Sequence, residues 1–264
     1  MARVALVLAV LLLVAASPAA AAASSVVIGR SSQGRAIKAV RLGNPHAKRT
    51  ALIVGQIHGD EPGGLAVTRA LRGRGGLGDV DLWVIDSANP DGGRAHRRQN
   101  ARGVDLNRNF PYRWTRTRRG DRYYGGPAPL SEPESRALSA FIQRVRPDVS
   151  IWYHQPWGAV LVPCGGKPPL ERLYARLAGL PTSCRGDGLR GTAVTWQNAR
   201  VGGHAFVVEL GAAAPSPAVA IRNARAAVRV VATAPVAARP VADADPVTGP
   251  NEAAWDELSF AFDT

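Results

Sequence analysis

The sequence has no apolar run long enough to cross a membrane as a helix, which takes roughly 20 residues. Its longest apolar run extends from Val4 to about Ala16, between the charged start Met-Ala-Arg and the small residues SPAAAAASS. A positive start, a short apolar core and a small-residue exit are typical of a secretory signal. We therefore expect residues 1–23 to be removed, with cleavage near Ala21 to Ala23. The mature protein would be secreted, extracellular or cell-wall associated, or periplasmic where an outer membrane is present.

Cysteine is also scarce, and the two cysteines are Cys164 and Cys184. They lack the spacing of a metal-binding pair, and no cysteine lies near the end of the leader to carry a lipid. After export to an oxidising compartment they can form a disulfide that closes a loop of about 20 residues and adds about 3 kcal/mol of stability. The alternative to the disulfide is two free thiols. For the leader, the alternative to cleavage and a soluble exported protein is an uncleaved membrane anchor.

Lysine is rare as well, because arginine supplies nearly all of the 33 basic residues that oppose 20 acidic ones. The formal net charge is +13, and ten arginines against two aspartates give residues 94–122 a charge of +8. Such a patch can indicate a nucleic-acid partner. The sequence shows an export signal and no nucleic-acid-binding motif, so we expect no nucleic acid and no stable membrane insertion. An anionic extracellular substrate or surface explains the charge better.

Hydrophobic residues make up 46% of the chain, and a mature chain of roughly 240 residues can bury a large core, which suits one α/β domain. Apolar or alternating runs predict strands at residues 36–43, 51–56, 81–86, 148–154 and 204–210. Helical spacing predicts helices at residues 63–73, 131–146 and near 219–232. Strands that alternate with helices predict a mixed, mostly parallel central sheet with helices on both faces.

Three segments have special features. Ser131 and Glu134 are spaced as a capping box at the start of the second predicted helix. Residues 94–130 lack periodicity and should form a long ordered loop, which is usually functional inside a compact domain. Residues 233–264 are an Ala/Pro-rich tail of low complexity.

Two metal-capable side chains, His58 and Glu61, follow a predicted central strand in the segment GQIHGDEPGG, whose glycines we expect to permit a sharp turn. His154 ends another predicted strand, and ligands gather at the carboxyl ends of such strands. Two histidines and a carboxylate make a three-ligand zinc site that leaves a fourth position for water. His204 begins its strand, so we expect it at the opposite edge of the sheet. The H-x-x-E spacing alone is weak evidence, since a lone histidine at a strand end is more often structural.

The downstream sequence strengthens this interpretation. The segments HGDE, NPDG, RQNARGVDLNRNFP and FVVEL occur in this order and resemble those of the zinc carboxypeptidases of the carboxypeptidase A type. Within this family, the sequence resembles the branch of the bacterial murein peptide amidases and their relatives. The resemblance covers roughly residues 26–211 and implies a carboxypeptidase-like α/β catalytic domain over residues 24–232 with one Zn²⁺ ion.

Matched position by position, the resemblance implies that His58, Glu61 and His154 bind the zinc. Asp105 matches the acidic residue that hydrogen-bonds a ligand histidine, which fixes its tautomer and raises its basicity. Glu209, at the end of the last predicted strand, matches the general base. A carboxylate in an apolar run is also costly to bury without a role. A turn-forming Asp105 and a salt-bridged Glu209 are the structural alternatives.

Arg98 matches the arginine that polarises the scissile carbonyl, although Arg97 and Arg102 lie close enough to leave the register open. Asn107 and Arg108 match the pair that holds the substrate's terminal carboxylate, a role that suits a planar guanidinium. Structural bridges between loops are the alternative for both.

One departure from the family pattern concerns a tyrosine that closes over the substrate in many relatives. Residues 175–209 contain no tyrosine, and Leu189 lies about where it is expected. Tyr153 or Trp196 are the candidates to replace it. Side-chain preference should depend on the pocket around residues 187–197.

These features predict a monomeric, exported zinc metallocarboxypeptidase that acts on a small peptide with a free carboxylate, such as the γ-D-glutamyl-diaminopimelate bond of a cell-wall muropeptide. A zinc deacylase of N-acyl amino acids is a second interpretation. A non-catalytic wall-binding module on the same scaffold is a third, favoured only by the missing tyrosine.

Overall fold

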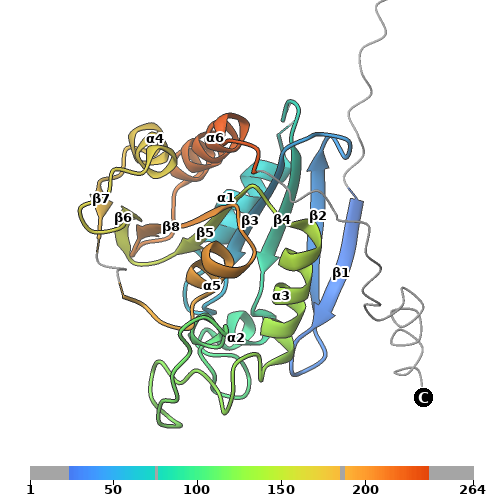
Figure 1. The fold of residues 1–264 in the computed structure, drawn as a ribbon, viewed down its shortest axis with the longest axis vertical. Helices are drawn as coiled ribbons and strands as arrows, with labels where there is room; N and C mark the ends of the chain where they lie inside the picture. Colours follow the sequence, from blue (N-terminus) through green and yellow to red (C-terminus); the bar gives the residue numbers. More distant parts are fainter. Residues whose placement is uncertain (1–23, 75–76, 185–187, 238–264) are drawn as a thin grey trace, which may run out of the picture.

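A computed structural model describes residues 24–74, 77–184 and 188–237 (Figure 1). Its eight-stranded sheet has the order β1-β2-β4-β3-β5-β8-β6-β7 in this part of the chain. Strands β4, β3, β5 and β8 are parallel, β2 is antiparallel to β1 and β4, and β6 is antiparallel to β8. The strands are β1 (Ser24–Arg30), β2 (Ala36–Gly43), β3 (Thr50–Gln56), β4 (Asp81–Ser87), β5 (Val149–His154), β6 (Trp157–Leu161), β7 (Thr182–Ser183) and β8 (His204–Gly211).

Helices cover both faces of this sheet, as predicted. Helices α1, α4 and α6 pack on one face, whereas α3 and α5 pack on the other (Figure 1). The helices are α1 (Gly63–Arg72), α2 (Pro90–Ala95), α3 (Pro133–Val145), α4 (Pro169–Ala178), α5 (Ala193–Arg200) and α6 (Pro217–Thr233), with a 3-10 turn η1 (Leu106–Arg108). The expected leader and most of the expected tail lie outside the described residues. Within the described ranges no helix is long and apolar enough to cross a membrane.

The central strand β3 explains why the sheet needs both helical layers. Ala51 and Ile53 point into the core beneath α1 and α6, and Leu52 and Val54 point into the core beneath α3 and α5. Each of these side chains is at most 1% exposed. Burying a side chain such as Leu52 or Ile53 contributes about 1.5–3 kcal/mol, so β3 is a rigid base for the residues that follow it.

The chain turns directly after β3, where the Glu61 amide donates to the His58 carbonyl, and the glycines of this segment also permit close packing. Gly59 and Gly64 are not among the residues with positive φ. A Cβ atom on Gly59 would overlap the backbone of Gly92 in α2, and one on Gly64 would overlap the carbonyl of Gly55. Helices α1 and α2 can therefore pack directly against the end of β3.

The predicted capping box at the start of α3 is wrong. Glu132 is the N-cap residue and makes no side-chain capping bond, and Pro133 occupies the first turn. Ser131 instead donates its hydroxyl hydrogen to Glu132. The carboxylate of Glu134 accepts hydrogen bonds from the Ser32 amide and the Asn100 side chain. These long-range contacts take the atoms that a local capping box would use.

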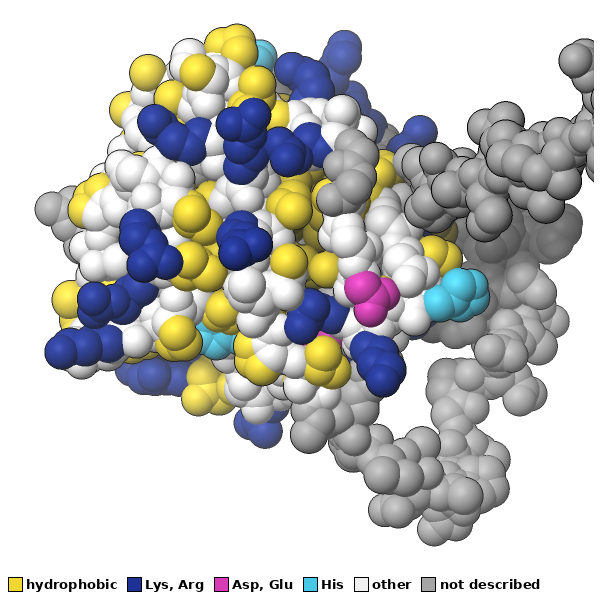
Figure 2. All heavy atoms as spheres, turned by 90° about the horizontal axis from the view of Figure 1, so that it is seen from above, with side chains coloured by type: hydrophobic (Ala, Val, Ile, Leu, Met, Phe, Trp, Pro, Cys, Tyr) yellow, Lys and Arg dark blue, Asp and Glu magenta, His cyan; other side chains and the backbone are white. Residues whose placement is uncertain are grey.

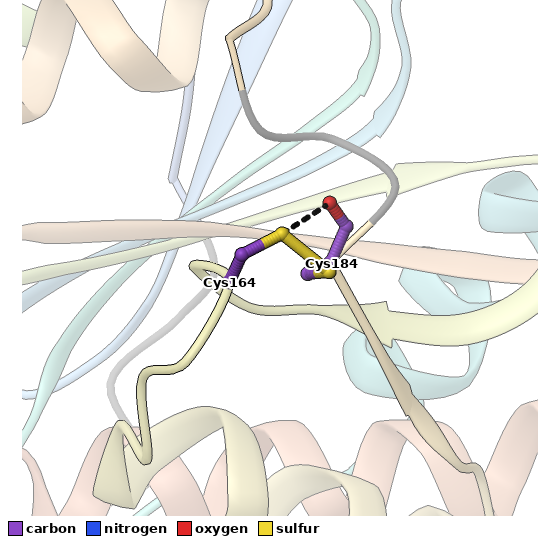
Figure 3. Close-up of a disulfide and its surroundings, with 2 residues drawn as sticks. All are labelled: Cys164 and Cys184. Atoms are coloured by element: carbon purple, nitrogen blue, oxygen red, sulfur yellow. Dashed lines mark hydrogen bonds between the residues drawn. A yellow bond between two sulfur atoms is a disulfide. The ribbon is translucent and has the colours of Figure 1, made fainter.

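A disulfide joins Cys164 and Cys184, which follow β6 and β7 (Figure 3). The bridged segment contains α4, so the covalent link ties this helix to the edge of the sheet. The Sγ atom of Cys164 also lies 3.4 Å from the carbonyl oxygen of Cys184.

Positive charge is spread beyond the Arg-rich loop. Seen from above, the face formed by α4 and α6 carries many basic side chains among hydrophobic ones (Figure 2). They include Lys167, Arg172, Arg176, Arg222, Arg225 and Arg229. The excess of arginine is therefore a property of this face as well as of residues 94–122.

Candidate active site

The polar cluster predicted from the strand ends is brought together at the carboxyl edge of the sheet. His58 and Glu61 lie between β3 and α1, and His154 is the last residue of β5. Glu209 is the direct neighbour of His154 across the β5–β8 pair. His204 lies at the other end of β8 and bonds Glu171 at 2.8 Å, as expected from its place at the start of the strand.

The side chains of His58, Glu61 and His154 converge in a group that could hold a metal ion. The two Nδ1 atoms are 3.1 Å apart, and each lies 2.9 Å from one carboxylate oxygen of Glu61. Tetrahedral zinc with Zn–N bonds of about 2.0–2.1 Å separates its ligand atoms by about 3.3 Å. The donor set and its spacing therefore fit zinc.

The protonation states of two members of this group, His154 and Glu61, also favour a cation. Burial lowers the pKa of His154, which keeps its imidazole neutral. Burial works against ionised Glu61, but the hydrogen bonds from His154 and His58 lower the pKa of this carboxyl well below its usual range. A neutral imidazole and an ionised carboxylate are the forms that bind metal. The pKa of His58 is raised because Asp105 and Glu61 outweigh the effect of burial.

Asp105 connects the ligand group to Arg98. One carboxylate oxygen of Asp105 lies 3.1 Å from His58 Nε2, and the other accepts bonds of 2.9 Å from Nε and Nη2 of Arg98. Asp105 is 0% exposed. Burial opposes its charge, but His58 and Arg98 hold the pKa of this carboxyl well below its usual range. An ionised Asp105 orients the His58 ring so that Nδ1 faces the ligand group.

Of the three arginines considered for this role, Arg98 is the one whose side chain reaches the ligand group. Its Nη1 lies 3.1 Å from both Glu61 Oε1 and His58 Nδ1. Arg97 instead donates to the carbonyl of Asn100, and Arg102 is an exposed residue near Glu132. The chain reaches this position because Asn89, which caps α2, donates to the carbonyls of Ile57 and Arg98.

Asn107 and Arg108 extend from η1 toward the same cavity. Asn107 accepts a bond from the Ala193 amide, and its Nδ2 lies 3.4 Å from His154 Nε2. Arg108 donates to the carbonyl of Asn107 but, among the described residues, forms no salt bridge. Burial and the charge of Arg98 lower its pKa, partly offset by Asp105. A cation without a paired carboxylate suits an anionic ligand.

Glu209 faces this cavity from β8 and is 6% exposed. Burial, followed by the charge of Glu61, raises the pKa of Glu209 to about 7. A carboxyl group with this pKa can both accept and release a proton near neutral pH.

A cavity of about 440 Å³ is lined by all these groups except Asp105, which lies buried behind His58 and Arg98. Leu189 lines it, as expected for the position where relatives carry tyrosine. Tyr153 and Trp196 do not line it, since Tyr153 bonds Tyr174 in the core and Trp196 packs on Phe110. Neither side chain can therefore replace the missing tyrosine.

The walls of the cavity include residues that the sequence did not reveal. Tyr123, Arg122, Trp157 and Leu161 all line it, so the pocket is broader than the predicted segment around residues 187–197. Gln155 lies beneath the site, where its amide donates to Glu61 and its side chain accepts from Gly63. No local motif marks these residues, because tertiary packing brings them to the cavity.

Comparison with known proteins identifies the class. The zinc carboxypeptidase family matches residues 13–183, so the chain belongs to this family, whose members are hydrolases that use one Zn²⁺ ion. Murein peptide amidase A of Escherichia coli strain K12 is 32% identical over 134 residues, covering 43% of this chain and 52% of the relative. The match thus spans about half the length of that relative.

Solved structures show the same fold. The murein-tripeptide amidase of Escherichia coli O157 superposes with a TM-score of 0.65 at 28% identity, covering 78% of this chain and 91% of that one. Carboxypeptidase A of Helicoverpa armigera superposes with a TM-score of 0.68 at 20% identity, covering 80% and 68%. The predicted carboxypeptidase-like α/β fold is confirmed.

Proposed function

We propose that this zinc carboxypeptidase relative is an exported peptidase that hydrolyses an amide bond in a small peptide with a free carboxylate. The γ-D-glutamyl-diaminopimelate bond of a muropeptide is the substrate we favour. The observation that carries the proposal is the meeting of His58, Glu61, His154, Glu209 and an unpaired arginine in one cavity. Murein-processing relatives and the basic cavity support the choice of substrate. The apolar leader of the sequence supports export.

Each side chain has a role that follows from its surroundings. Bound zinc, held by the two histidines and Glu61, would polarise the scissile carbonyl and acidify a water. Glu209 takes the proton from the attacking water and delivers it to the leaving amine, as its pKa permits. Arg98 donates to the negative charge that develops on the carbonyl oxygen. Asn107 and Arg108 hold the terminal carboxylate, and Asp105 keeps His58 and Arg98 in orientation.

We further propose that residues 24–232 form the catalytic domain, preceded by a removable leader and followed by the Ala/Pro-rich tail. The sequence of residues 1–23 supports the leader, which lies outside the described structure. We also propose that the mature protein acts as a monomer.

The test is to measure the zinc content of the mature protein and its hydrolysis of L-Ala-γ-D-Glu-diaminopimelate. We expect about one zinc per chain and release of diaminopimelate. Cleavage of N-acyl amino acids with the tripeptide left intact would favour a deacylase. Zinc binding with no turnover of any peptide or acyl amino acid would favour a wall-binding module, and a protein that binds no zinc would refute the proposal.

The pH profile of kcat/KM should fall at acid pH because the general base, Glu209, becomes protonated. Glu209 must be deprotonated to accept a proton, so kcat/KM should fall about tenfold per pH unit below its pKa. That pKa is about 7 for the protein alone, against an ordinary value of 4.5. A bound cation lowers the pKa of a neighbouring carboxyl group, so we expect the acid limb of the profile to have its midpoint between about 7 and 4.5.

Metal content must be measured at each pH in that experiment, because protonated ligands release metal. A kcat/KM that stays constant from pH 8 down to pH 4.5, at constant zinc content, would contradict this assignment of the base.

A further inference from the structure

Tyr123 is the centre of a group of three arginines at the rim of the cavity. The guanidinium carbons of Arg98 and Arg108 both lie 5.2 Å from its ring centroid, and that of Arg122 lies 6.0 Å away. Tyr123 is 49% exposed and lines the cavity. Contact with an aromatic face helps to keep repelling cations together. The rim is therefore strongly positive.

A side pocket of about 120 Å³ adjoins the main cavity beside this ring. Arg108 and Tyr123 line both spaces, and Thr115, Thr117 and Arg190 complete the side pocket. Among the described residues, those that line it carry two guanidinium groups, three hydroxyl groups and no carboxylate. Guanidinium and hydroxyl groups are the hydrogen-bond donors that a carboxylate prefers.

The cations around the side pocket are available to a ligand. In the described part of the chain, no salt bridge joins Arg108, Arg122 or Arg190 to a carboxylate. By contrast, Arg98 has its charge matched by Asp105 and Glu61. The terminal carboxylate of a peptide would neutralise one of these cations, and a second anion would still be favoured.

We propose that the side pocket between Arg108 and Arg190 binds a second carboxylate of the substrate, carried by the side chain of its C-terminal residue. The proposal rests on the proposed function, which puts the terminal carboxylate at Arg108. Because Arg108 borders both spaces, one residue with two carboxylates can reach both. The site then selects peptides that end in an acidic residue over peptides that end in a neutral or basic one.

A pair of peptides that differ by one carboxylate tests this selectivity. L-Ala-γ-D-Glu-diaminopimelate and L-Ala-γ-D-Glu-L-Lys share the same scissile bond, but the lysine peptide lacks the second carboxylate. We expect the parent protein to favour the first by about tenfold or more in kcat/KM, mostly through KM, the scale of a charge-assisted bond. The variant Arg190→Gln should lose most of this ratio. Equal rates on the two peptides in the parent would overturn the proposal.

The matched control is Arg119→Gln, which removes the same charge from an exposed residue of the loop that does not line either pocket. It should keep the parent ratio. A similar loss in Arg119→Gln and Arg190→Gln would show that the overall positive field, and not the side pocket, sets the preference.

Binding of free amino acids separates this proposal from the proposed function. Calorimetric titration of the zinc-loaded protein with diaminopimelate and with lysine needs no turnover. We expect a Kd about tenfold lower for diaminopimelate in the parent and similar values for both in Arg190→Gln. Discrimination without hydrolysis would keep the subsite and reject the peptidase function. Hydrolysis of the tripeptide without discrimination between the two amino acids would support the peptidase function and reject the subsite.

Tyr123 has a positioning role in this proposal, because its ring lies against the arginines. Tyr123→Phe keeps the ring and should keep the preference for the second carboxylate, whereas Tyr123→Ala should reduce it. Loss of the preference in both variants would assign the effect to the phenol hydroxyl and contradict the positioning role.

Discussion

The variant Glu209→Gln should bind zinc like the parent and lose about 10³-fold in kcat, the scale of positioned general acid–base catalysis. Glutamine has nearly the same shape as glutamate but accepts no proton. Its position in β8 keeps residue 209 beside His154, and it does not belong to the group of His58, Glu61 and His154 that could hold the metal. Zinc content measured together with single-turnover hydrolysis of the tripeptide gives both quantities.

A matched control is Glu171→Gln, which alters another buried carboxylate, 3% exposed, that bonds His204 far from the cavity. It should keep nearly full activity. If Glu209→Gln retained more than about a tenth of the parent kcat, far above the residual rate expected without a general base, a different group would have to transfer the proton. A loss of zinc in Glu209→Gln would instead indicate that Glu209 supports the ligand group.

Much of the sheet could be predicted because its central strands are apolar on both faces. The predicted strand at residues 36–43 coincides with β2, and those that became β3, β4, β5 and β8 are off by one residue at an end. Helix α6 was expected near residues 219–232 and spans Pro217–Thr233. A buried strand needs apolar residues within its own short segment, so the pattern that predicts it is local in the sequence.

Most of the elements that were missed lack such a local signal. Helices α4 and α5 were missed as well, although α4 has amphipathic helical spacing. Strand β1 is mostly exposed, at the edge of the sheet, and β6 and β7 are short. Helix α2 has the sequence PDGGRA, which disfavours a helix. It forms because Asn89 caps it and Asp91 accepts bonds from Ser31, Ser32 and Arg35 across the sheet edge. These are tertiary contacts, and no window of sequence contains them.

The residues of the site likewise fall into those that were predicted from the sequence and those that were not. The ligand residues and Glu209 follow or end predicted strands, so the predicted topology together with the family resemblance predicted their meeting. Tyr123 comes from the aperiodic segment between η1 and α3, whose course depends on contacts such as Thr117 with the Gly125 amide. Nothing in its own neighbourhood marks Tyr123 as part of the cavity. The sequence therefore predicted the metal-binding group, whereas the substrate rim required the structure.

Asp105→Asn should weaken both the metal site and the fold. The two carboxylate oxygens of Asp105 serve His58, the Asn107 amide and two nitrogens of Arg98, in a fully buried position. In asparagine, an NH₂ group replaces one of the two carboxylate oxygens and faces another hydrogen-bond donor. The loss of the negative charge also leaves the charge of Arg98 less well balanced. We expect zinc affinity to fall about 10–100-fold, as for other residues that orient metal ligands. The free energy of unfolding of the metal-free protein should fall by about 3 kcal/mol.

The direction in which the stability difference between the parent and Asp105→Asn changes with pH can also be checked. Because the folded state lowers the pKa of Asp105 below its ordinary value of 3.8, its charge contributes fully to stability above that value and loses this contribution as the pH falls. The stability difference between parent and Asp105→Asn should therefore be largest near neutral pH and narrow below about pH 4. Asp60→Asn, at an exposed position beside Glu61, is the control and should change neither quantity. Equal zinc affinities in a competition titration of parent and Asp105→Asn would mean that His58 keeps its orientation without the carboxylate.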